Sequence, residues 1–257
     1  MTEELLSIFA ALLGLIVGSF INVVAYRVPL HRSVVSPGSA CPRCEHPLHW
    51  RDNIPVISWI RLRGRCRHCA ERISIRYPVV EIVTAALFAV TVLTIGTQWV
   101  LPAYLWFTGV TVTLTLTDLD HKLIPNRILF PSTAIAVALL GIGALLDGEI
   151  TSFGRGLLAG LVYFAVLLVI ALIARGGFGF GDVKLAAFLG LYAGYLGWGH
   201  LLVSLFLPFA VGGIISILLL ITRIKGRKDA IPFGPYMVIG AYAAVAYGQD
   251  IVDWYLR

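Results

Sequence analysis

The chain has 257 residues, of which 58% are hydrophobic and only 13% charged, and its mean hydropathy is +0.87. A soluble domain carries about a quarter charged residues, so this composition excludes an ordinary soluble protein and indicates long segments that contact lipid. The net charge of +6 is compatible with a nucleic-acid partner, but the distribution of the basic residues gives a different explanation.

The apolar segments predict a protein with eight transmembrane helices. A span needs roughly 20 apolar residues. The first run lacks a basic segment before it and is longer than a signal-peptide core, so we expect it to be retained. A short Gly197-Trp198-Gly199-His200 connection leaves seven spans as an alternative. The predicted fold class is an all-α polytopic membrane protein with spans at 5–25, 78–95, 99–117, 128–146, 157–174, 184–200, 201–222 and 233–249.

The basic residues predict the orientation, because lysine and arginine concentrate in cytoplasmic loops. With the N-terminus outside, all but Arg155 and Arg257 of the 20 Lys and Arg residues fall in cytoplasmic segments or at their edge. We therefore expect both termini outside, and no nucleic-acid partner is needed to explain the charge. The cytoplasmic segments are 26–77, 118–127, 175–183 and 223–232, with Lys184 at a helix start.

The first cytoplasmic segment, 26–77, contains all four cysteines of the chain: Cys41, Cys44, Cys66 and Cys69. Their C-x2-C-x21-C-x2-C pattern is typical of two tight turns that direct four thiolates at one zinc ion. Two structural disulfides are the first alternative, which a reducing cytoplasm disfavours. A redox-active pair is the second, and it is disfavoured because no thioredoxin-like context is present. The pattern predicts a closed, structural zinc site in a zinc-ribbon-like loop, with none of the four histidines of this segment as a ligand.

Two acidic segments indicate catalysis at the inner membrane surface. Asp118 and Asp120 follow the third span, and Asp182 precedes the sixth, so the topology brings them to the same face. Ionisable groups beside spans are costly and often functional. Two carboxylates at one site share a proton, so one can deprotonate water while the other polarises a carbonyl.

Each aspartate also has a structural interpretation. Asp182 is a plausible cap for a helix that begins near Val183, and Asp118 is a plausible interfacial residue. Gly179 and Gly181 fit either a close substrate approach or a turn before that helix. Serine catalysis is disfavoured because Ser204 and Ser216 lie within a span, and cysteine catalysis competes with zinc for the same sulfurs.

Six motifs in order resemble those of the type IV prepilin peptidases, which are bifunctional leader peptidases and N-methyltransferases. The resemblance runs nearly end to end. The motifs are Gly18-Ser19-Phe20-Ile21-Asn22-Val23-Val24 through Arg27-Val28-Pro29, the cysteines with Asn53-Ile54-Pro55-Val56-Ile57-Ser58-Trp59 between the pairs, Arg76-Tyr77-Pro78-Val79-Val80-Glu81, Asp118 with Ile124-Pro125-Asn126, Gly179-Phe180-Gly181-Asp182, and Ile231-Pro232-Phe233-Gly234-Pro235.

The resemblance implies an aspartic endopeptidase of the inner membrane that removes the basic leader of prepilins or pseudopilins after a glycine, on the cytoplasmic side. It implies Asp118 and Asp182 as the catalytic pair, with Gly179, Gly181 and Lys184 near the substrate, and it selects Asp118 over Asp120. Residues two apart on a helix point about 200° apart, so Asp118 and Asp120 cannot both face Asp182.

The resemblance further implies N-methylation of the new amino terminus with S-adenosylmethionine. No Gly-rich turn of a dinucleotide-type fold marks a cofactor site. We expect that site to involve the amino-terminal signature and the zinc loop, with Asn22 and Glu81 as candidates, although both residues could instead form structural hydrogen bonds between helices. The predicted division is a first helix at 1–25, a zinc-binding loop at 26–77 and a peptidase core at 78–257.

Two other classes of protein are the alternatives. A transporter would use intramembrane carboxylates for proton coupling, but its acids usually lie near the middle of the bilayer. A membrane-anchored zinc-ribbon interaction module would explain the cysteines but not the aspartates.

Overall fold

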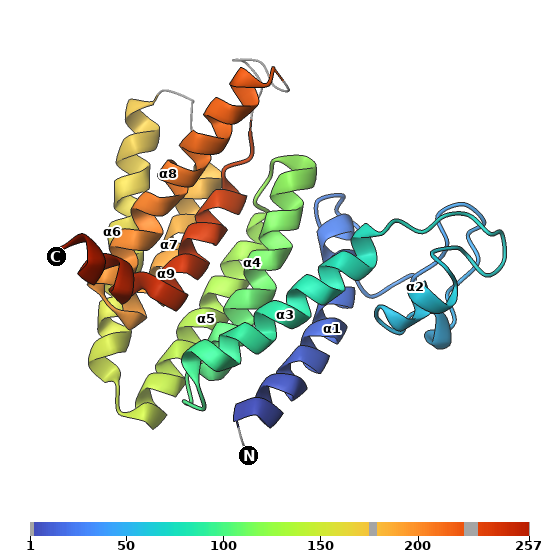
Figure 1. Ribbon diagram of the computed structural model, residues 1–257, viewed down its shortest axis with the longest axis horizontal. Helices are drawn as coiled ribbons and strands as arrows, with labels where there is room; N and C mark the ends of the chain where they lie inside the picture. Colours follow the sequence, from blue (N-terminus) through green and yellow to red (C-terminus); the bar gives the residue numbers. More distant parts are fainter. Residues whose placement is uncertain (1–2, 175–178, 224–230, 257) are drawn as a thin grey trace. The chain divides into compact units, whose positions relative to one another are not determined.

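The computed structural model describes residues 3–174, 179–223 and 231–256, and in these ranges the chain forms helices without a strand (Figure 1). The predicted all-α fold is confirmed. Two short elements lie between the first two long helices. In chain order the elements are α1 (Glu3–Arg27), η1 (Trp50–Asp52), α2 (Ile57–Arg61), α3 (Arg76–Ile95), α4 (Leu101–His121), α5 (Asn126–Asp147), α6 (Ile150–Ile173), α7 (Phe180–Leu196), α8 (Trp198–Ile221) and α9 (Gly234–Tyr255).

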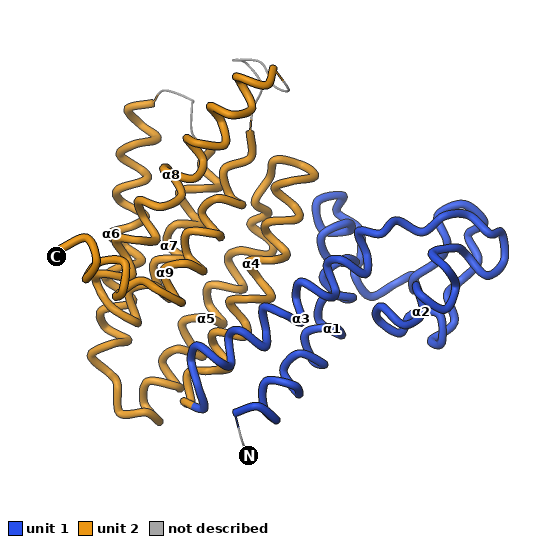
Figure 2. The backbone as a smooth tube through the Cα atoms, viewed as in Figure 1, with its two compact units in different colours: residues 1–97 blue, residues 98–257 orange. Residues whose placement is uncertain are grey.

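The chain divides into two compact units, residues 1–97 and 98–257 (Figure 2). In the first unit α1 and α3 lie side by side, and the loop with α2 continues from one end of this pair (Figure 1). The helices approach closely because Gly14 and Gly18 face the α3 backbone. A Cβ at Gly14 would lie 2.7 Å from the Ala85 Cα, and one at Gly18 would lie 2.8 Å from the Glu81 Cα. Small residues at such contacts are a common device for packing helices in lipid.

The second unit contains α4 to α9. Helices α4 and α7 are its most buried elements, and aromatic side chains connect them. The Tyr104 hydroxyl donates to the Tyr192 carbonyl at 2.9 Å. The Phe107 and Phe188 rings stack with their planes 11° apart. These contacts fix α4 and α7 against each other. They therefore also position the last turn of α4 and the first turn of α7, which carry Asp118 and Asp182.

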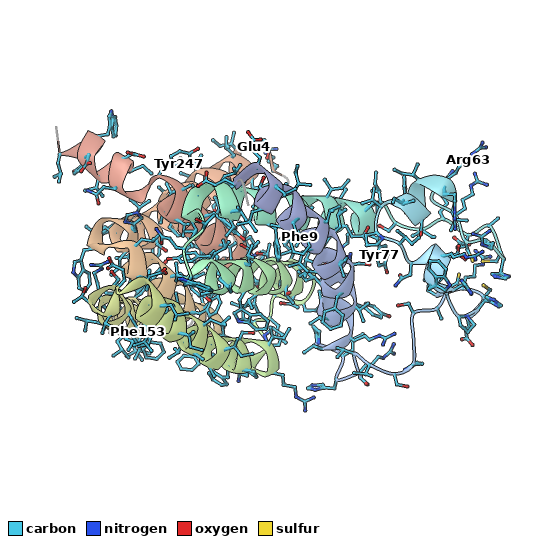
Figure 3. All side chains as sticks on the ribbon, turned by 90° about the horizontal axis from the view of Figure 1, so that it is seen from below. Glu4, Phe9, Arg63, Tyr77, Phe153 and Tyr247 are labelled. Carbon is cyan, nitrogen blue, oxygen red and sulfur yellow. The ribbon has the colours of Figure 1, made fainter. Side chains whose placement is uncertain are left out.

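Five helices, α1, α3, α5, α6 and α8, are long and apolar enough to cross a membrane by length and composition. They expose large apolar side chains, such as Phe9, that stand out from the helix surface (Figure 3). Helices α4, α7 and α9 correspond to the other three predicted spans. The first two bury most of their surface in the unit, so they accommodate threonines and aspartates that a lipid-facing helix would not.

Several helix boundaries differ from the predicted spans. Helix α6 begins at Ile150 and not near 157, because Arg155 lies inside it and donates to the carbonyls of Gly194 at 2.8 Å and Tyr195 at 2.6 Å. These carbonyls end α7 and have no partner in that helix. Helix α7 begins at Phe180 and α9 extends to Tyr255. Parts of two predicted basic segments, 175–178 and 224–230, lie outside the described residues.

Candidate active site and metal centre

Asp118 lies in the last turn of α4, and only 5% of its surface is exposed. The helix ends just beyond it, where Lys122 takes a left-handed conformation with φ of 52° and donates its N–H to the Asp118 carbonyl at 2.8 Å. Asp120, two residues on, is exposed. The two carboxyl groups therefore differ in surroundings as helix geometry predicts, and Asp118 is the one that faces the interior.

The Asp118 carboxylate is held by the start of α9. The backbone N–H of Gly234 donates to Oδ2 of Asp118 at 2.9 Å. A Cβ at Gly234 would lie 2.8 Å from the same oxygen, closer than a real Cβ approaches. Only glycine leaves room for the carboxylate at this position. This contact joins residues that are 116 apart in the sequence.

Asp182 lies in the first turn of α7 and is 9% exposed. The helix begins at Phe180 with Gly179 as its N-cap, so Asp182 does not cap a helix that begins near Val183. Its carboxylate instead accepts a hydrogen bond from the backbone N–H of Gly179, as in a capping box. The carboxylates of Asp118 and Asp182 are close enough to interact electrostatically.

The motifs around the two aspartates contact each other. A Cβ at Gly181 would lie 3.2 Å from the Ile124 Cβ, so this glycine lets α7 pack against the turn that follows α4. Lys184 donates to the Asn126 Oδ1 and lies over the rings of Phe130 and Phe180. Gly179 thus contacts Asp182 directly, whereas Gly181 and Lys184 connect the start of α7 to the segment after α4. Their place beside the substrate stays a prediction.

The four cysteine sulfurs also come together. Their Sγ atoms all lie within 4.8 Å of one another, with Cys41 and Cys69 at 3.7 Å and Cys44 and Cys66 at 4.0 Å. Tetrahedral coordination with Zn–S bonds of about 2.3 Å requires sulfurs about 3.8 Å apart. A disulfide would need about 2.05 Å, and all four cysteines are free. The set fits a metal ion and not two disulfides.

Two similar turns present these sulfurs. In each turn the residue four positions after the first cysteine, Glu45 or Ala70, has a φ of 55° and donates its N–H to the carbonyl of that cysteine. Backbone N–H groups of Cys44 and Arg43 lower the pKa of the Cys41 thiol to about 6. A thiolate is the form that binds metal, so the turn favours coordination.

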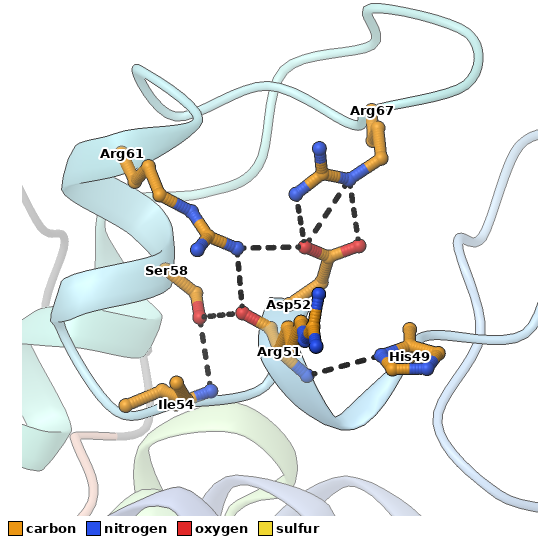
Figure 4. Close-up of polar contacts among 7 residues, drawn as sticks. All are labelled: His49, Arg51, Asp52, Ile54, Ser58, Arg61 and Arg67. Carbon is orange, nitrogen blue, oxygen red and sulfur yellow. Dashed lines mark hydrogen bonds and ion pairs between the residues drawn. The ribbon is translucent and has the colours of Figure 1, made fainter.

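An ion-pair network connects the second turn to the short helices of the loop (Figure 4). Arg67 donates to both oxygens of Asp52, and Arg61 donates to the Asp52 Oδ1 at 3.3 Å. The Arg67 guanidinium lowers the pKa of the Asp52 carboxyl group. Ser58 accepts from the Ile54 N–H and donates to the Arg51 carbonyl, both at 2.9 Å. These contacts order a loop that has little apolar core.

Asn22 and Glu81 both make structural hydrogen bonds in the first unit. The Asn22 amide donates to the carbonyls of Gly18 and, on the neighbouring helix, Tyr77. The Glu81 carboxylate, 7% exposed, accepts the N–H of Val56 at 2.7 Å. Val56 has a φ of 59°, which is rare for a β-branched residue and stores about 1–3 kcal/mol of strain. Glu81 thus stabilises a strained turn in the zinc loop.

Sequence reasoning did not give Gly234 or Val56 a role. The signal for Gly234 was present in the motif Ile231-Pro232-Phe233-Gly234-Pro235, where a glycine at a helix start indicates a close approach. Nothing local predicts the positive φ of Val56, because Val is disfavoured in that conformation. Its hydrogen bond to a residue on α3 becomes visible only in the fold.

The fold and the two clusters define a multi-pass membrane protein with two buried aspartates near each other and four cysteines placed to hold a metal ion. The family model described as "Bacterial Peptidase A24 N-terminal domain" matches residues 12–95, and that of the "Type IV leader peptidase family" matches residues 105–217. These matches fall within the first and the second compact unit, respectively. No solved structure matches the chain.

Several relatives are named "Prepilin leader peptidase/N-methyltransferase". The chain is 37% identical to the one from Aeromonas salmonicida, over 95% of this chain and 92% of the relative. It is 34% identical to the Bacillus subtilis protein over 95% of both chains. It is 33% identical to the Pseudomonas aeruginosa protein, over 96% of this chain and 92% of the relative. The chain belongs to the prepilin leader peptidase/N-methyltransferase family, and the predicted resemblance is confirmed.

Proposed function

We propose that this protein is a multi-pass enzyme of the bacterial inner membrane that cleaves the basic leader from prepilins or pseudopilins and methylates the new amino terminus. The observation that carries the peptidase assignment is the pair of buried carboxylates, Asp118 and Asp182, at the ends of α4 and α7. A transporter is disfavoured because both acids lie at helix ends. A binding module that uses only the cysteine centre leaves both acids without a role.

In the proposed cleavage, one of the two carboxylates takes a proton from water as the water attacks the scissile carbonyl. The other, protonated, donates a hydrogen bond to the carbonyl oxygen and later gives its proton to the leaving amine. Burial helps because it disfavours two negative charges side by side, so the pair holds a single proton. We assign Gly179, Gly181 and Lys184 to the surroundings of the substrate backbone.

We propose that the site faces the cytoplasm, with both termini outside. Basic residues next to the aspartates, His121, Lys122, Arg127 and Lys184, support this orientation. A substrate with its leader inside and its apolar helix in the bilayer would present the junction at this depth. Since the enzyme's loops are themselves basic, we infer that it recognises the junction by packing and backbone contacts and not by charge.

Single cysteines at positions 122 and 180 test the orientation, because both positions are exposed. In cells whose four native cysteines are replaced, a membrane-impermeant thiol reagent should leave both positions unlabelled until the membrane is opened. A cysteine at the exposed Tyr255 is the matched outer control and should label in intact cells. Labelling of 122 and 180 from outside would invert the orientation and remove the proposed substrate path.

We propose that methyl transfer belongs to the first unit. A cavity of about 370 Å³ opens there between the end of α1 and the loop, and ligand pockets range from roughly 300 to 1,000 Å³. Ser19 and Asn53 supply polar groups, while Val23 and Pro55 supply apolar walls. Asn53 and Pro55 belong to the segment whose strained Val56 is held by Glu81. S-adenosylmethionine, when bound, supplies the methyl group, and these residues would orient it towards the peptide amine.

Replacement of Glu81 by Ala should impair methyl transfer while leaving cleavage close to wild type. Without its carboxylate the Val56 N–H has no partner and the turn relaxes, which displaces Asn53 and Pro55. We expect methylation of a pre-cleaved pilin peptide to fall by about 10–100-fold, as for a lost supporting contact. Thr94→Ala is the control on the same helix, because this exposed hydroxyl bonds only its own helix at Val90. Equal methylation by both variants would contradict the assignment.

A further inference from the structure

We infer that Gly234 is a positioning residue for Asp118, which makes the start of α9 a third part of the peptidase site. This inference rests on the proposed function. It assigns a role in cleavage to the start of α9, where no role could be predicted from the sequence. The contact that carries it is the hydrogen bond from the Gly234 N–H to the Asp118 Oδ2 at 2.9 Å.

The backbone N–H groups at the start of α9 differ in whether they find a partner within the helix. The first N–H groups of a helix have no partner within it. Tyr236 and Met237 donate back to the Phe233 carbonyl, and Pro235 has no N–H. The Gly234 N–H therefore donates to a group outside α9, and the buried Asp118 carboxylate accepts this hydrogen bond. The positive end of the helix dipole also favours a negative charge there.

Gly234 also lies too close to Asp118 to carry a side chain. A Cβ at Gly234 would lie 2.8 Å from the Asp118 Oδ2 and 3.3 Å from its Cγ. Any other residue would displace either the carboxylate or the start of α9. At Gly213 of α8, by contrast, nothing lies within 4 Å of such a Cβ. Gly234 therefore has a specific neighbour to accommodate, and that neighbour is the proposed catalytic carboxylate.

Asp182 is held by a glycine in the same way as Asp118. Gly179 begins α7 and donates its N–H to the Asp182 carboxylate, and a Cβ at Gly179 would lie 3.1 Å from the Asp182 Oδ2. Each aspartate is thus oriented by the backbone of a glycine at a helix start. An N–H on one oxygen fixes the rotamer and leaves the other oxygen for water or substrate. Hydrogen bonds to the ionised form also favour that form.

The test is Gly234→Ala in purified full-length protein, with Gly213→Ala as the matched control. We expect kcat for cleavage of a pilin-like peptide to fall by about 10–100-fold, because small misplacements of a catalytic group have effects of that size. KM should change little. The acid limb of the kcat–pH profile should move to higher pH, since the ionised carboxylate loses a donor. Gly213→Ala should match wild type in all three quantities.

Each outcome either supports or overturns the inference. If Gly234→Ala retains wild-type kcat and pH profile, or loses kcat without any change in the profile, Gly234 does not position Asp118. If wild-type protein does not cleave, the proposed function fails instead. Should Gly234→Ala not fold, amide exchange in Asp118→Ala decides: the 233–236 segment should exchange faster than in wild type, and unchanged exchange would overturn the inference.

Discussion

Asp118→Asn and Asp182→Asn are each expected to abolish cleavage of a prepilin substrate while the protein still inserts and folds. An asparagine keeps the shape and the hydrogen-bond acceptor of the carboxylate but cannot take or give the shared proton. Positioned acid–base groups contribute about 10²–10⁴-fold to a rate. We therefore expect activity below about 1% of wild type in either variant, measured on purified protein with a pilin-like peptide.

Asp120→Asn is the matched control, because it removes a carboxylate from the same turn of α4 but from an exposed position. It should cleave at a rate within a few-fold of wild type. Metal content and methylation of a pre-cleaved peptide should be unchanged in all three variants, since we propose that both properties belong to the first unit. If Asp118→Asn or Asp182→Asn retains more than a few per cent of activity, that residue leaves the proposed pair.

The helices could be predicted from the sequence because long apolar runs leave few alternatives. Even α4 and α7, which the criterion of length and composition does not select, were located correctly by their apolar stretches. The residues at which the helices begin or end were harder to predict. The start of α7 at Phe180 depends on the capping contacts of Gly179, and the start of α6 depends on Arg155 reaching the carbonyls at the end of α7. Such contacts join different helices and leave no periodic signal.

The candidate site was predictable to the extent that its chemistry is local in sequence. Paired cysteines and a glycine-rich turn before an aspartate are patterns within a few residues. The contact between Asp118 and Gly234 spans 116 residues, and that between Val56 and Glu81 spans 25. A single sequence carries no record of which distant residue fills a hydrogen bond. The sequence therefore indicates candidate residues for both centres, while the partners that orient them become evident only in the fold.

Loss of the metal should separate the two proposed activities. Purified protein is expected to carry about one zinc per chain, bound by the four cysteines, because their sulfurs fit tetrahedral coordination. Four thiolates leave no position for water, so we propose a structural ion whose binding energy folds the loop. Without it, the turns at Cys41 and Cys66 lose their common anchor, and the segment 53–56 beside the cavity loses its support.

Cys41→Ala should therefore abolish stoichiometric zinc and reduce methyl transfer by at least about tenfold, as expected when a metal-ordered loop unfolds. Cleavage should fall less, because Asp118 and Asp182 lie in the second unit.

His68→Ala is the control: this exposed histidine neighbours the cysteines in sequence but is outside the ligand set, and the variant should keep its zinc. Elemental analysis of freshly reduced protein, with thiol titration, measures the first effect. Absence of metal together with four freely reactive thiols would exclude the closed site, whereas a larger loss of cleavage than of methylation would show that the peptidase site itself depends on the loop.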